Sequence, residues 1–140
     1  MAIPSTLYAQ PSDLIRYCTN APSIAGVAVD VQRAALEDAS REFDNHIKSI
    51  FSGQDALPLV EWDNSVRKNV CWMACYEIFR VRGFDPNRGS DVLIVKDRDD
   101  AKAWMLRVQR QEIRPYMVGQ PAAPLPVNEP IVRSKPLKGY

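Results

Sequence analysis

The sequence predicts an all-α protein, a small four-helix bundle followed by an extended proline-rich C-terminal arm. Apolar residues recur at helical spacing over about residues 30–50 and again over about 63–82. Six of the eleven prolines fall from Pro115 onward, and proline lacks an N–H and fixes φ. We therefore expect a helical domain over residues 1–114 and an arm over residues 115–140.

Two helices are expected in the first third of the chain. Pro11-Ser12-Asp13 supplies turn and cap chemistry for a short helix that contains residues 14–18. Residues 19–29 are small and apolar and are interpreted as a loop. Asp30 is expected to cap the second helix, because its carboxylate can accept a bond from a first-turn N–H. Gly53 is expected to end that helix.

The third and fourth helices are expected over about residues 63–82 and 91–112. Asp63 or Asn64 can cap the third helix, and Gly83 can end it. Its apolar residues leave little polar surface, so we expect it to be central or to be covered by a partner. Pro86 and Gly89 favour a turn before the fourth helix.

The connection between the second and third helices, DALPLVEWDNSV at residues 55–66, is unusually apolar for a linker. Either it folds over the core of its own chain or it packs on another molecule. We treat it as a candidate interface loop. Its apolar members are Leu57, Pro58, Leu59, Val60 and Trp62.

Length and charge limit the possible functions. At 140 residues the chain is most simply one domain. Its 18 basic and 17 acidic side chains give a formal net charge of +1, which argues against general binding to nucleic-acid phosphates and against a polybasic membrane anchor. The sequence shows neither a signal peptide nor an apolar run long enough to cross a bilayer. Three cysteines form no disulfide framework, which favours a reducing cytosol.

No residue pattern indicates catalysis, a metal or a cofactor. His46 is the only histidine and has no recognisable catalytic partners, so a structural or surface role is expected. Cys71 and Cys75 are expected to be small hydrophobic core residues, and Cys18 is remote. The acidic run Asp97, Asp99 and Asp100 alternates with cations and is expected on a solvated helix face. There is no glycine-rich phosphate loop, no GxSxG and no HExxH.

Several basic residues could in principle meet DNA phosphates. They share no single face, and acidic residues lie between them, so solvent-exposed or interface roles are expected. These residues are Arg67, Lys68, Arg80, Arg82, Arg107, Arg110 and Arg114.

The arm is the most unusual segment. A disordered terminus is one interpretation, but its apolar residues are typical of a segment that binds a partner. EPIVRSKP resembles a strand-like ligand that adds to a sheet edge or lies in a groove, and Arg133, Lys135 and Lys138 would suit an acidic rim. Fully extended, the arm would reach roughly 80 Å. The predicted partner-binding residues are Tyr116, Leu125, Val127, Ile131, Val132, Arg133, Lys135, Leu137 and Tyr140.

The order of several short motifs resembles one protein family. LYAQPSDLIRYC is followed by the helix ALEDASREFDNHIKSIF, then ALPL, and finally DDAKAWMLRV. Over roughly residues 7–113 this order resembles the Mu-type family of phage head–tail cluster proteins, related in fold to the all-α head–tail connectors, or adaptors, of long-tailed phages. The chain differs from that pattern at Trp62-Asp63 and at Gln54-Asp55-Ala56, and the arm lies outside it.

The resemblance implies a structural protein of the virion neck, made in the host cytoplasm. It implies a cyclic homo-oligomer of about twelve copies between the portal protein and a downstream neck or tail protein, with DNA passing through the lumen without sequence-specific contacts and no membrane involved. A stopper or tail-completion protein is the first alternative. A small helical DNA-binding regulator, recognised by salt-dependent duplex binding, is the second, and an enzyme with an unrecognised site is the third.

Overall fold

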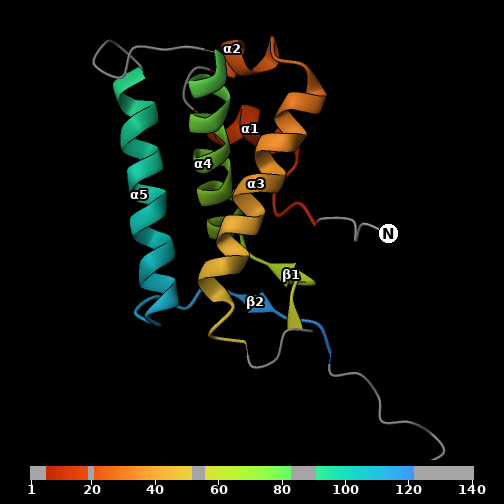
Figure 1. The fold of residues 1–140 in the computed structure, drawn as a ribbon, viewed down its shortest axis with the longest axis vertical. Helices are drawn as coiled ribbons and strands as arrows, with labels where there is room; N and C mark the ends of the chain where they lie inside the picture. The colour runs from red at the N-terminus through yellow and green to blue at the C-terminus, as the bar shows by residue number, and fades with distance from the viewer. Residues whose placement is uncertain (1–5, 19–20, 52–55, 83–90, 122–140) are drawn as a thin grey trace, which may run out of the picture.

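The computed structural model describes residues 6–18, 21–51, 56–82 and 91–121. Three long helices lie side by side: α3 (Val29–Ile47), α4 (Asn64–Arg82) and α5 (Asp91–Gln109) (Figure 1). Two short helices, α1 (Pro11–Tyr17) and α2 (Ala21–Ala25), precede them. A two-stranded sheet joins β1 (Glu61–Trp62) to β2 (Met117–Val118). The predicted all-α class is confirmed.

Helix α4 is the central element, as its lack of polar surface predicted. It packs against α1, α3 and α5. Its residues Val66, Val70, Ala74 and Ile78 are buried and follow the helical repeat. These three helices belong to the same chain, so the chain itself covers the buried residues of α4.

Of the two residues predicted as possible caps of α4, Asp63 and Asn64, the structure uses Asp63. The Asp63 carboxylate accepts the backbone N–H groups of Ser65 at 3.0 Å and Val66 at 3.3 Å. These donors have no partner inside the helix, so this is a side-chain N-cap. In α1, Pro11 occupies the first turn, and Asp13 accepts the N–H of Gln10 at 2.8 Å.

The start of α3 differs from the prediction. Asp30 lies in the first turn, and Ala28 is the N-cap. The cause is the short helix α2, which lies in the segment predicted as a loop and buries Ile24 completely. The Gln32 amide donates to the carbonyls of Ile24 at 3.1 Å and Val27 at 2.9 Å. These bonds join α2 to α3 and fix where α3 begins.

The ends of two long helices are also earlier than predicted. Helix α3 ends at Ile47, whose carbonyl accepts the N–H groups of Ile50 and Phe51 in a turn. Helix α5 ends at Gln109, and Gln111, with a φ of 61°, reverses the chain. Three predicted turn or cap glycines, Gly53, Gly83 and Gly89, lie outside the described residues, as does Pro86.

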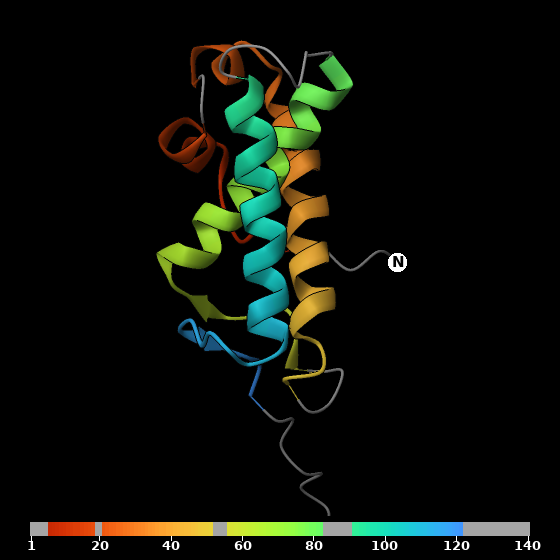
Figure 2. The same cartoon turned by 90° about the vertical axis from the view of Figure 1, so that its left-hand side faces the viewer.

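The sheet lies at the end of the bundle where α3 and α5 end and α4 begins (Figures 1 and 2). β1 and β2 are antiparallel, with Glu61 opposite Val118 and Trp62 opposite Met117. The backbone bonds continue on both sides: Asp63 donates to Tyr116, and Gln120 donates to Ala56. The segment predicted as an arm therefore begins inside the packed domain, which extends to about residue 120.

Candidate functional site

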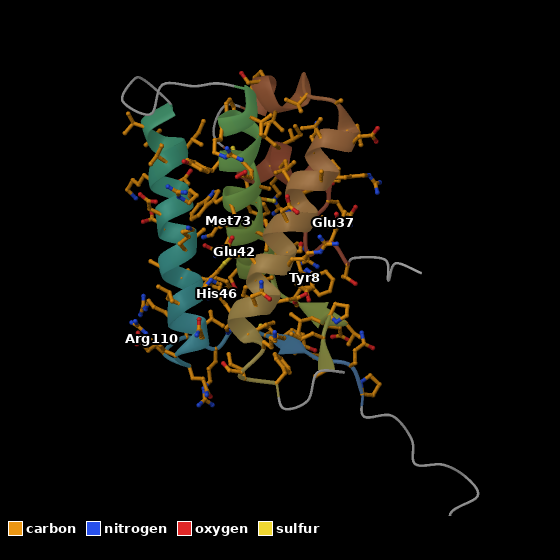
Figure 3. All side chains as sticks on the ribbon, in the orientation of Figure 1. Tyr8, Glu37, Glu42, His46, Met73 and Arg110 are labelled. Atoms are coloured by element: carbon orange, nitrogen blue, oxygen red, sulfur yellow. The ribbon has the colours of Figure 1, made fainter. Side chains whose placement is uncertain are left out.

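The candidate interface loop is held by Tyr8, a completely buried side chain from the N-terminal segment. The Tyr8 hydroxyl donates to the Asp44 carboxylate of α3 and accepts the N–H of Leu59 at 2.9 Å. The Tyr8 carbonyl accepts the indole N–H of Trp62 at 2.8 Å. Figure 3 shows Tyr8 between α3 and the sheet. Tyr8 thus connects three segments that are far apart in the sequence.

Aromatic packing strengthens this connection. The Tyr8 ring meets the rings of Trp62 and Phe43 edge to face, with centroids 4.7 Å and 5.9 Å apart. Phe43 in turn stacks on Trp104 of α5 at 5.6 Å. The loop is therefore fixed to α3, and through Phe43 to α5.

The Tyr8–Asp44 pair is electrostatically unusual. Burial, together with the hydrogen bond to Asp44, raises the pKa of the Tyr8 hydroxyl well above its ordinary value. Burial also raises the pKa of Asp44, although the bond from Tyr8 opposes that shift. The hydroxyl therefore stays protonated and remains a hydrogen-bond donor at neutral pH.

Most of the predicted interface loop covers the core. Leu59 is buried, while Leu57, Pro58 and Trp62 are half-buried, and the Leu57–Pro58 peptide bond is cis. Val60 is the exception, with 45% of its surface exposed. The apolar composition of the loop is thus explained mainly by its own chain, and Val60 is the loop residue available to a partner.

Residues 56–63 and 116–120 together form what we call the sheet end. Tyr116 is 56% exposed, and its hydroxyl donates to the Glu61 carboxylate at 2.6 Å. That bond raises the pKa of Tyr116. Gln120 donates to the Pro58 carbonyl at 2.8 Å. Val60 and Tyr116 are therefore exposed apolar groups on a backbone that is fixed by hydrogen bonds.

Asp63 links the sheet end to α4. Its second carboxylate oxygen accepts the N–H of Tyr116 at 3.1 Å, while the first caps the helix. Partial burial raises the pKa of Asp63, but the bonds from Ser65, Tyr116 and Val66 outweigh it and lower the pKa overall. The ionised form is thus the one that holds β2 against the start of α4.

The other predicted partner-binding residues lie in residues 122–140, outside the described part of the chain. They are Leu125, Val127, Ile131, Val132, Arg133, Lys135, Leu137 and Tyr140. The last described residues, Gln120 and Pro121, follow β2 at the sheet end.

His46 has a structural contact. Its Nδ1 lies 2.8 Å from Oε1 of Gln109, which joins the last turns of α3 and α5, and Figure 3 shows His46 between these helices. The predicted structural or surface role fits this position.

The three cysteines are buried and free, which confirms the core position predicted for Cys71 and Cys75. The Cys18 thiol donates to the Cys71 carbonyl at 3.5 Å. Its pKa is raised by its contact with Cys75 and by burial, and burial raises the pKa of Cys71. The thiols of Cys18 and Cys71 therefore remain protonated and are poor nucleophiles and metal ligands.

The charged residues of α5 form local pairs. Lys96 contacts Asp100 at 2.7 Å with the predicted i,i+4 spacing, and Arg98 contacts Asp99 at 2.9 Å. Among the described residues, no group of three or more His, Cys, Asp or Glu side chains could hold a metal ion.

The basic residues are spread over several surfaces. Lys68 lies over the Trp72 ring at 5.0 Å, and Arg67 lies over Trp62 at 5.8 Å. Arg80 pairs with Glu77, and Arg107 pairs with Glu112. Arg110 and Arg114 are exposed. Within the described ranges, no helix is long and apolar enough to span a membrane.

Sequence reasoning missed the role of Tyr8. The only local signal is an aromatic residue in a short polar segment, which does not show that its hydroxyl accepts the N–H of a residue 51 positions away. The β1–β2 pairing was missed for a related reason, since each strand has only two residues.

Searches of curated proteins and of solved structures find no match to the chain. A family model does match it over residues 8–134, from Tyr8 into the C-terminal segment, and its description is Bacteriophage Mu, Gp36. This match covers nearly the whole length. The chain therefore belongs to the Bacteriophage Mu Gp36 family and is a phage structural or morphogenesis protein.

Proposed function

We propose that this protein is a head–tail connector, or adaptor, of the phage neck. In this role a closed ring of about twelve copies binds the portal protein on one side and a neck or tail protein on the other. DNA passes through the lumen without sequence-specific contacts. The observation that supports the proposal most directly is the match to a phage structural or morphogenesis family over residues 8–134.

The geometry is compatible with a ring. A closed head-to-tail ring needs two different surfaces on each copy. The sheet end exposes Val60 and Tyr116. The halves of α3, α4 and α5 that lie away from the sheet end also expose apolar residues, which are Val29, Val31, Val81, Val92 and Leu93. Exposed apolar groups at both ends of one helical domain supply two such candidate surfaces.

The proposal treats the protein as a scaffold without catalysis or a cofactor. The contacts of His46, the cysteines and the α5 carboxylates are structural. A stopper or tail-completion protein would share these features and would differ in its position along the neck.

The first experiment is the copy number of this chain in purified particles, measured by quantitative mass spectrometry against the major capsid protein. About a dozen copies per particle supports a single ring. Absence of the chain from particles would overturn the connector role and favour an assembly factor or a DNA-binding regulator. Cryo-electron microscopy of the neck then distinguishes a connector touching the portal from a stopper below it.

A second experiment removes the arm by ending the chain after Pro121. A cut after Glu112 would also remove Ile113 and Met117, which pack against the core, and β2 itself. We expect the shorter chain to keep its helical circular-dichroism spectrum and to fail to support infectious particles. An unchanged particle yield would show that the arm has no part in assembly.

A further inference from the structure

A groove runs along α3 and is bounded by α4 and, in its second section, also by α5. Its first section is lined by Val31, Ala34 and Asp38 of α3 and by Ile78 and Val81 of α4. Its second section is lined by Ala39 and Glu42 of α3 and by Met73 and Tyr76 of α4, with two cations from α5. The sections share Ala35, Asp38 and Glu77, so they form one continuous groove. Figure 3 shows Glu42 and Met73 on this face.

The first section of the groove exposes apolar side chains beside the Glu77–Arg80 ion pair. Val31 is 43% exposed and Val81 is 73% exposed. The alanines of α3 leave room in the groove, because a methyl group fills little of the space between two helices. Exposed valines on a narrow, small-residue floor are suited to an extended apolar segment.

The second section is acidic on its α3 side. Asp38 and Glu42 make no ion pair with any residue in the described ranges. Elsewhere along the groove charges are matched: Glu77 pairs with Arg80 at 2.6 Å, and Arg98 pairs with Asp99 at 2.9 Å. Lys102 is the remaining cation of the lining. The α3 rim therefore offers two carboxylates to an incoming cation.

The C-terminal arm has the matching composition. Residues 122–140 hold three cations, Arg133, Lys135 and Lys138, and one anion, Glu129, for a net charge of +2. Since the chain totals +1, residues 1–121 carry −1. Ile131 and Val132 immediately precede the cations. The arm thus presents an apolar pair followed by positive charge.

The spacing of these groups also agrees. Val31 and Asp38 are seven residues apart on α3, about 10 Å at the helical rise. Val132 and Lys135 are three residues apart, about 10 Å in an extended chain. An arm that places its apolar pair against Val31 and Val81 therefore brings the cations of residues 133–138 to the level of Asp38 and Glu42.

The direction of the arm decides which copy it comes from. The described chain leaves from the sheet end, whereas α3 begins and α4 ends at the opposite end of the bundle (Figures 1 and 2), and Val31 and Val81 belong to those two turns. An arm returning along its own groove would meet Glu42 first and Val31 last, so its apolar pair and its cations would face the wrong groups. The order matches when the arm enters from the Val31 end, as an arm from another copy can.

We propose that residues 131–138 of one copy bind the α3–α4 groove of a neighbouring copy, with Ile131 and Val132 on Val31 and Val81 and the arm cations along Asp38 and Glu42. This inference names a partner within the proposed ring. It rests on the proposed function, because the ring supplies the neighbouring copy. It makes the arm the connection between adjacent members of the ring.

The test replaces Val132 with a photo-crosslinking phenylalanine analogue in particles and irradiates them. We expect a covalent dimer of this chain on a denaturing gel, with the cross-link mapped by mass spectrometry to residues 31–42 or 73–81. A cross-link within one chain, to the portal or to another surface would overturn this inference and leave the proposed function standing. Absence of the chain from particles would remove both.

A charge exchange tests the acidic rim. We expect Asp38→Lys with Glu42→Lys to reduce the dimer yield at least fivefold, and a second copy carrying Arg133→Glu and Lys135→Glu to restore it. The matched control is Glu112→Lys, since Glu112 is exposed after α5 and neither it nor its partner Arg107 lines the groove, and it should leave the yield unchanged. Equal losses for the rim and control variants would overturn the assignment of the arm cations to Asp38 and Glu42.

Discussion

The substitution Tyr8→Phe tests how the interface loop is attached, because it removes one hydroxyl and keeps the ring. Packing against Phe43 and Trp62 would be retained. Asp44 would lose a donor, and the N–H of buried Leu59 would lose its acceptor. A buried group left without its partner costs about 1–3 kcal/mol. Because Leu59 is such a buried group and Asp44 is half-buried, we expect a loss of about 2 kcal/mol in the free energy of unfolding.

The assay is urea unfolding followed by circular dichroism, with Tyr116→Phe as the matched control. The control removes the same atom from an exposed hydroxyl, so its stability should stay within about 0.5 kcal/mol of the original chain. A double-mutant cycle of Tyr8→Phe with Asp44→Ala should show a coupling of about 1–2 kcal/mol. Equal stability of Tyr8→Phe and the original chain would refute the proposed attachment of the loop.

The pH dependence gives a second readout of the same pair. Burial raises the folded-state pKa of Asp44 above 3.8, and Tyr8→Phe removes the bond that opposes that shift. Between 3.8 and the folded pKa, the folded state binds more protons than the unfolded state, so stability falls as pH rises. The deficit of Tyr8→Phe should therefore grow as the pH is raised from about 4 to 7. A pH-independent deficit would show that Asp44 does not contribute to it.

Three further predictions concern other parts of the fold. Asp63→Ala removes the cap of α4 and should cost about 1–2 kcal/mol at pH 7 in urea unfolding. Because the folded-state pKa of Asp63 is lowered, this loss should shrink as the pH falls below 3.8. A loss that stays constant with pH would contradict the assigned role. Gly119→Ala places a methyl group 2.9 Å from a backbone oxygen and 3.0 Å from the Phe51 ring, and should cost about 1–3 kcal/mol by the same assay. Gly26→Ala, with its nearest atom at 3.7 Å, should cost less than Gly119→Ala. The three buried thiols should resist a thiol reagent at pH 8 in the folded protein and all react in denaturant, whereas rapid labelling of the folded protein would refute their burial.

The sequence predicted the helices in which apolar residues recur many times at helical spacing. Helices α3 and α4 each bury residues at helical spacing over 19 positions, so their existence follows from local pattern. Asp63 was one of two predicted caps of α4, because a capping carboxylate acts on N–H groups two and three residues away. The start of α3 was not, because the bonds of Gln32 to the end of α2 fix it.

The sequence alone determined the all-α class, the central position of α4 and the composition of the arm, since these depend on periodicity, polar surface and proline content. Only the tertiary structure decided what the apolar loop does and where the arm leaves the domain. Leu59 is buried and a hydroxyl 51 residues away accepts its N–H, while β2 pairs with β1 across 55 positions between Trp62 and Met117. Contacts over such separations depend on how the helices pack, and no local pattern in the chain encodes them.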